Sequence, residues 1–87
     1  MRFWAKIKID QKIINDCEYE REINENDNIN VDLISDILVY LCNEMDLSRP
    51  VILKKHIKQL NEFSKTEFSK NDFIEKIKFD CLEIELI

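Results

Sequence analysis

The sequence contains one histidine, His56, and three cysteines, the side chains most often used for nucleophilic and zinc chemistry. A Cys–His nucleophile would need a thiol beside His56, and a zinc site would need ligands at short, regular spacing. Cys17, Cys42 and Cys81 are far apart in the sequence and form no C-x-x-C pair. His56 also falls on the apolar face of a helical pattern, which is typical of a core or flanking residue. We therefore expect no catalytic residue, no metal and no cofactor.

The chain has no glycine among its 87 residues. Dinucleotide fingerprints, P-loops and nucleophile elbows need glycine where the backbone turns sharply or closes on phosphate. The sequence therefore excludes these three kinds of site. It also requires the tight turns to be made by Asp, Asn, Ser, Lys or the single Pro.

Residues 24–30 are rich in asparagine and superficially resemble a calcium-binding loop, which also alternates oxygen ligands. An EF-hand loop that began at Asn24 would need glycine and glutamate where this sequence has Ile29 and Ser35. We therefore favour a solvated loop that leads into a helix capped by Asn30.

Carboxylates are concentrated in one run of the sequence. They are Asp16, Glu18, Glu20, Glu22, Glu25 and Asp27. At strand spacing the first four project from one face in a row. Charges along an edge strand prevent aggregation between sheets, which is the favoured explanation, and the alternative is a docking surface for a basic partner.

Trp4 is the best single candidate for a binding residue. It alternates with Phe3 and Ala5, so it falls on the opposite face of its strand, between Arg2 and Lys6. An exposed Trp beside Arg or Lys is typical of interaction hot spots. The alternative is that Trp4 packs under Tyr19, the hairpin loop or the C-terminus.

Lysines gather on one face of an expected helix at Lys54, Lys55 and Lys58. A solvated face explains them best, and contact with nucleic-acid phosphates is the minority interpretation. No aromatic stacking platform is interleaved with them, and the net charge of the chain is −5.

Two strands are expected at the N-terminus, over residues 2–9 and 13–20, because apolar and polar side chains alternate there. We expect a three-residue loop, Asp10-Gln11-Lys12, since its register gathers the apolar residues on one face. The expected pairs are Ile9 with Ile13, Ala5 with Cys17, and Phe3 with Tyr19. A two-residue loop would place Ala5 opposite Asp16.

Three helices are expected after the hairpin. Apolar residues at spacings of three and four predict the first over 31–45 and the second over 51–64, with Pro50 suited to the first turn of the second.

A short third helix is predicted over 68–77. There Ser69 and Asp72 have the spacing of a capping box, and Phe68 and Phe73 have that of a hydrophobic staple.

A final strand is predicted over 79–86, which gives an α+β fold with the order β-β-α-α-α-β. We expect the helices on one face of a small antiparallel sheet, with the last strand beside the first and the second strand at an edge. The chain should form a single domain, residues 1–87. It has no apolar run long enough to span a membrane and no export signal, so we expect a cytoplasmic protein with reduced cysteines.

Several short motifs run through most of the chain: R-x-W-x-K-I-x-x-D-x-K-I at 2–13, D-L-S-R-P at 46–50, T-x-F at 66–68, D-F-I at 72–74 and F-D-x-L-E-I at 79–84. With these motifs the chain resembles a group of small, uncharacterised bacterial proteins of similar length. The group has no established activity. The resemblance therefore implies one compact cytosolic domain and no functional residue.

The sequence thus predicts a non-enzymatic protein-interaction or regulatory module. Its candidate binding residues are Trp4, Arg2, Lys6, Glu18, Glu20 and Glu22. The alternative is a small nucleic-acid-associated protein that uses Arg2, Lys6 and Lys8 together with the helix lysines. A homodimer through the edge strand stays open.

Overall fold

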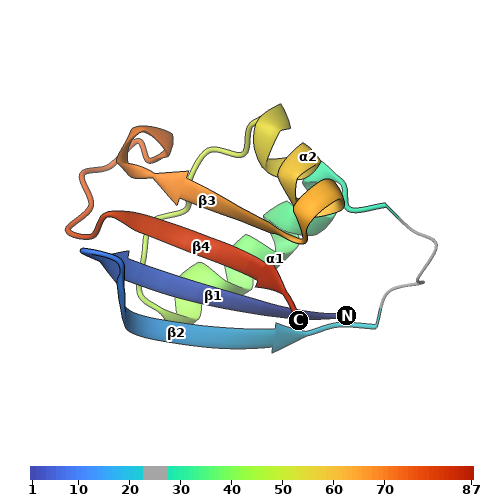
Figure 1. Cartoon of the computed structure of the whole chain (residues 1–87), viewed down its shortest axis with the longest axis horizontal. Coiled ribbons are helices and arrows are strands. Elements are labelled where there is room, and N and C mark those ends of the chain that lie inside the picture. The colour runs from blue at the N-terminus through green and yellow to red at the C-terminus, as the bar shows by residue number, and fades with distance from the viewer. Residues whose placement is uncertain (23–27) are drawn as a thin grey trace.

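The computed structural model describes residues 1–22 and 28–87. These residues form an α+β fold with a four-stranded antiparallel sheet, two α-helices and one 3-10 turn (Figure 1). The strand order in the sheet is β2-β1-β4-β3. Along the chain the elements are β1 (Arg2–Ile9), β2 (Lys12–Glu20), α1 (Val31–Glu44), α2 (Lys54–Phe63), β3 (Lys65–Ser69), the 3-10 turn η1 (Lys70–Asp72) and β4 (Cys81–Leu86).

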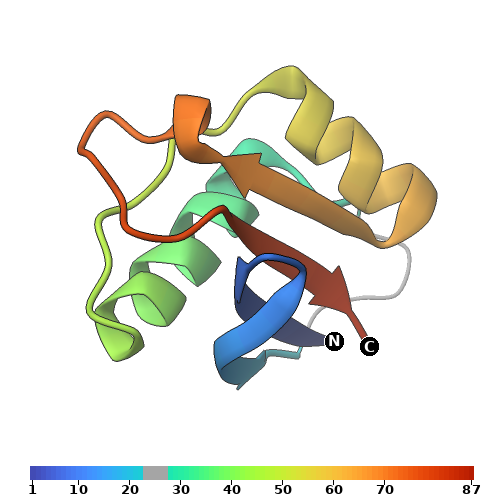
Figure 2. The same ribbon diagram turned by 60° about the vertical axis from the view of Figure 1, so that its left-hand side comes forward.

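The two α-helices lie on the same side of the sheet (Figures 1 and 2), as the sequence predicted. The core between the two layers is mainly apolar. Phe3 of β1, Leu82 and Ile84 of β4, and Ile34 and Leu41 of α1 are each at most 1% exposed. Burial of an apolar side chain of this size contributes roughly 1.5–3 kcal/mol, so this layer supplies much of the stability of the fold.

The predicted position of the last strand is confirmed, because β4 pairs with β1 and leaves β2 at an edge. The predicted element order is wrong in one place. Residues 65–69 form strand β3, and only residues 70–72 make a helical turn, so the order is β-β-α-α-β-β with two α-helices.

Strand β3 forms because its side chains alternate once they meet β4. Thr66 and Phe68 are buried, whereas the three residues around them are exposed. The expected capping-box contact is present, since the backbone N–H of Ser69 donates to Oδ2 of Asp72 over 2.9 Å. It closes one 3-10 turn rather than a helix, because Phe73 is already extended, at φ −104° and ψ 135°.

The hairpin turn between β1 and β2 is one residue shorter than expected. Asp10 and Gln11 form the turn, with φ values of 51° and 67°, and Ile9 pairs with Lys12. Two consecutive positive φ angles are those of the type I′ turn that suits twisted strands. Oδ2 of Asp80 accepts a hydrogen bond from the N–H of Asp10 over 2.8 Å and holds the turn.

A β-bulge on β2 at Ile14 restores most of the expected register. Beyond it, the pairs Ala5–Cys17 and Phe3–Tyr19 occur as predicted. Before it, Ile13 pairs with Lys8 instead of Ile9 and is 48% exposed, so the expectation that Ile13 faces the core is wrong. The extra residue shifts the alternation by one position, which moves Ile13 to the outer face.

Both α-helices begin at identifiable signals. Oδ1 of Asn30 accepts a hydrogen bond from the N–H of Leu33 over 2.9 Å, which confirms the predicted cap of α1. Helix α2 begins at Lys54, later than expected, because Leu53 is extended and the N–H of Val51 donates to the carbonyl of Asp72 over 2.7 Å. Among the described residues, no helix is both long and apolar enough to cross a bilayer.

Candidate functional site

The outer face of the sheet is the face opposite the two α-helices, and it carries most of the predicted binding residues (Figure 1). Strand pairing places Trp4 between Glu18 of β2 and Glu85 of β4. The side chains that the register assigns to this face are Arg2, Trp4, Lys6, Lys8, Ile13, Asp16, Glu18, Glu20, Lys65, Glu67, Ser69, Cys81, Glu83 and Glu85.

Trp4 is half-buried and is held by two neighbours. Its Nε1–H donates to Oδ2 of Asp16 over 2.9 Å, and Nζ of Lys6 lies 4.0 Å from the ring centroid. Tyr19 does not cover Trp4, since Tyr19 is on the inner face and stacks on Tyr40 at 4.5 Å. The indole is thus held in a fixed orientation and stays partly accessible.

Lys6 and Glu83 are buried at 6% and 3% exposure, although no described helix covers this face. Nζ of Lys6 lies 3.4 Å from Oε1 of Glu83 and 2.5 Å from Oε2 of Glu85, and Lys8 also pairs with Glu83. Burial acts to raise the pKa of Glu83, but the contact with Lys8 and the charge of Lys6 outweigh it and lower the pKa below its ordinary value. The same contact raises the pKa of Lys8. Glu83 and Lys8 therefore stay ionised near neutral pH.

The acidic residues are only partly gathered. Glu18 and Glu20 lie on the outer face of β2, and Oε2 of Glu20 is 3.9 Å from Arg2. Glu22 is exposed but lies beyond the end of the strand at Glu20, so it does not continue the row. Glu25 and Asp27 lie outside the described residues, as do Asn24 and Asn26 of the calcium-like pattern. The structure thus brings Trp4, Arg2, Lys6, Glu18 and Glu20 together and leaves Glu22 apart.

The basic residues do not form one surface. Lys6 and Lys8 are each paired with Glu83, whereas the exposed Lys54, Lys55 and Lys58 belong to α2, which lies beside β3 (Figure 1). A nucleic-acid site needs cations that are free to neutralise phosphates. The geometry therefore argues against a joint phosphate-binding face.

His56 is fully buried, which confirms its interpretation as a core residue. Its Nδ1 accepts a hydrogen bond from the N–H of Leu53 over 2.9 Å, and its Nε2 lies 3.4 Å from Oδ2 of Asp72. Its ring stacks on Phe68 at 4.2 Å. Burial lowers the pKa of His56 despite the nearby carboxylate. A neutral, inaccessible imidazole with its proton on Nε2 can orient Asp72 but cannot touch a substrate.

The three cysteines are free and poorly suited to act as nucleophiles. Burial raises the pKa of Cys42 to about 11 and also raises the pKa values of Cys17 and Cys81. Thiolates, not thiols, are the reactive form. Among the residues that the structure describes, no cluster of His, Cys, Asp and Glu has the geometry of a metal site.

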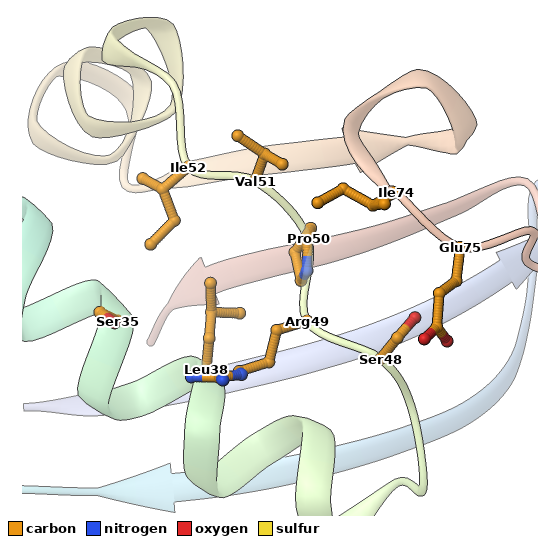
Figure 3. Close-up of a pocket in the computed structure, with 9 residues that line it drawn as sticks. All are labelled: Ser35, Leu38, Ser48, Arg49, Pro50, Val51, Ile52, Ile74 and Glu75. Carbon is orange, nitrogen blue, oxygen red and sulfur yellow. The ribbon is translucent and has the colours of Figure 1, made fainter.

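A second surface feature was not predicted. A groove of about 400 Å³ lies between α1, residues 48–52 and residues 74–75 (Figure 3). We call it the α1 groove; its main lining residues are Leu38, Arg49, Val51, Ile52, Ile74 and Glu75. Sequence periodicity could not predict this groove, because the groove is assembled from three separate segments. In addition, the predicted helix over 68–77 includes Ile74.

No protein-family model, curated protein or solved structure matches this chain. The resemblance to a group of small bacterial proteins stays a prediction, and the function must be argued from the geometry.

Proposed function

We propose that this protein is a non-enzymatic, cytoplasmic interaction module that binds a basic, extended segment of another protein. The segment adds alongside β2, and its side chains reach across the outer face to Trp4. The observation that carries the proposal is the indole of Trp4, which is half-exposed and held by Asp16 and Lys6 on a face that no helix of residues 1–22 and 28–87 covers. An aromatic contact that is already ordered loses little conformational entropy on binding.

The charge of the outer face favours a basic segment. Carboxylates outnumber cations there, and Lys6 and Lys8 are already neutralised by Glu83. The exposed charge along β2 is therefore mainly that of Asp16, Glu18 and Glu20. Opposite charge raises the rate of encounter and selects the register of the partner.

The edge position of β2 allows backbone hydrogen bonds to the bound segment, in addition to its side-chain contacts. An edge strand has free backbone N–H and C=O groups, and these can pair with an added strand. A second copy of this chain fits poorly, because β2 against β2 would bring rows of carboxylates together. The carboxylates thus disfavour pairing of β2 with β2 of a second copy, and they leave the edge available to a basic strand.

A fluorescence titration of the full chain tests the proposal, since Trp4 is its single Trp. An alternating Lys–Thr peptide should change the Trp4 emission and saturate, whereas the matched Glu–Thr peptide should not. The double variant Glu18→Lys/Glu20→Lys should lose the response, and Lys58→Glu on α2 serves as the control that retains it. An equal response to both peptides, or none to the basic one, contradicts the proposal.

A further inference from the structure

The α1 groove combines a lining of apolar and polar side chains with an exposed apolar projection on its rim. Ile74 is 89% exposed, the largest value among the described large hydrophobic residues, and Val51 is 42% exposed. Figure 3 shows Ile74 above the groove and Leu38 on its opposite side. A projecting side chain beside a matching hollow is unusual on an isolated surface, because both expose apolar area to water.

The walls of the groove are held in place by buried polar contacts. The N–H of Val51 donates to the carbonyl of Asp72, which joins the 48–52 segment to the chain that leads to Ile74. Oδ2 of Asp72 in turn accepts hydrogen bonds from Ser69 and lies 3.4 Å from His56. The groove is therefore preformed, and binding there requires little ordering of its walls.

The groove has opposite charges on its two sides. Arg49 extends toward α1 beside Leu38, whereas Glu75 lies on the side of Ile74 and turns toward Ser48 (Figure 3). Within residues 1–22 and 28–87, neither charged group has an ion-pair partner. Both remain available to a molecule that covers the groove.

We propose that the α1 groove is a self-association surface, at which a second copy of this chain docks around a two-fold axis. The axis places Ile74 of each copy over the partner's groove, whose floor includes the buried Leu38, and Glu75 of each copy beside the partner's Arg49. Every contact then occurs twice, as an isologous interface requires. A rigid groove with unlike charges on its two sides is complementary to itself under this rotation. Strand β2 is not self-complementary, because its exposed charges are mainly carboxylates.

Other occupants fit these observations less well. A small molecule would be covered on one side only, because the rim residues Ile74 and Val51 are themselves exposed. A heterologous partner would need an anion, a cation and an apolar projection in complementary positions, which a second copy supplies without further assumption. The interface lies away from β2, so it is compatible with the proposed binding of a basic segment.

Charge reversal in the full chain tests the proposal by sedimentation velocity over a concentration series. The wild type should dimerise, and R49E and E75R should each be monomeric, because like charges then face each other. An equimolar mixture of the two variants should form a heterodimer, since each reversed charge meets its opposite. A monomeric wild type, or a dimer that neither reversal weakens, would overturn the proposal.

A pair of matched apolar substitutions separates this groove from the rest of the surface. Ile74→Ser should raise the dimer dissociation constant about a hundredfold or more, because each of the two copies loses one Ile from the interface. Ile13→Ser removes an exposed Ile from the outer face and should leave dimerisation unchanged. If Ile13→Ser weakens the dimer as much as Ile74→Ser does, the interface is elsewhere and the proposal fails.

Discussion

The imidazole of His56 lies between a backbone amide and the carboxylate of Asp72: its Nδ1 accepts a hydrogen bond from the N–H of Leu53, and its Nε2 lies 3.4 Å from Oδ2 of Asp72. Because Nδ1 is an acceptor, the ring is neutral with its proton on Nε2. The same Asp72 oxygen accepts hydrogen bonds from Ser69. A buried polar cluster thus connects α2, the segment before it and the 3-10 turn.

We predict that the protein loses stability as pH falls through the slightly acidic range. Burial lowers the pKa of His56 in the folded state, so the unfolded chain binds a proton at a pH where the folded chain does not. The stabilisation is complete above the unfolded pKa of about 6.5 and disappears as pH falls through the folded pKa. Urea unfolding at a series of pH values measures it. His56→Gln should flatten this pH dependence, and a wild type that gains stability on acidification would contradict the assignment.

Asp72→Ala should lower the free energy of unfolding by about 2–3 kcal/mol, because the N–H and hydroxyl of Ser69 lose their acceptor and the buried imidazole of His56 loses the neighbouring carboxylate. Asp36→Ala is a suitable control, since Asp36 is exposed and forms only a surface pair with Arg21 at 3.6 Å. That substitution should change stability by less than about 0.5 kcal/mol. Equal effects of the two substitutions in thermal unfolding would show that the cluster contributes nothing.

Lys6→Ala should destabilise the fold by about 3 kcal/mol, because it leaves the buried carboxylate of Glu83 short of a partner. The double variant Lys6→Met/Glu83→Leu should lie closer to the wild type than the sum of its single variants. Apolar side chains can replace a buried ion pair without a desolvation penalty. Chemical denaturation of the wild type, Lys6→Met, Glu83→Leu and the double variant gives the coupling energy between the two side chains. Additive effects of the two single variants would contradict a direct pair.

Gln11→Gly should stabilise the protein by about 1 kcal/mol, since Gln11 has a φ of 67° that glycine adopts without a Cβ penalty. Lys12→Gly should destabilise it, because Lys12 is a strand residue paired with Ile9. The melting temperatures of the two variants, compared with that of the wild type, test this ranking. The opposite ranking would support the three-residue loop that the sequence favoured.

Local patterns predicted the elements whose side chains repeat without interruption. Strand β1, the cap of α1 at Asn30 and the pairing of Phe3 with Tyr19 follow from alternation, helical spacing and burial of one face. The length of the turn between β1 and β2 did not follow from the sequence pattern, because the bulge at Ile14 compensates for a shorter turn. The apolar pattern is the same for both arrangements, so the sequence could not distinguish them.

Strand β3 and the α1 groove depend on contacts between distant segments. Residues 65–69 carry a helix-capping signal at their end, and only their pairing with β4 makes them a strand. On the outer face, the sequence placed Trp4 beside Lys6 correctly. It did not predict Asp16 as the partner of the indole, because that contact depends on the strand register.

The indole N–H of Trp4 offers the most direct test of the binding surface, because it gives a single resolved signal in a ¹⁵N-labelled sample of the full chain. Titration with the basic Lys–Thr peptide should shift this signal and the backbone amides of β2, and leave those of α2 unchanged. Shifts confined to Lys54, Lys55 and Lys58, or an indole signal that does not move, would contradict a binding site on the outer face of the sheet.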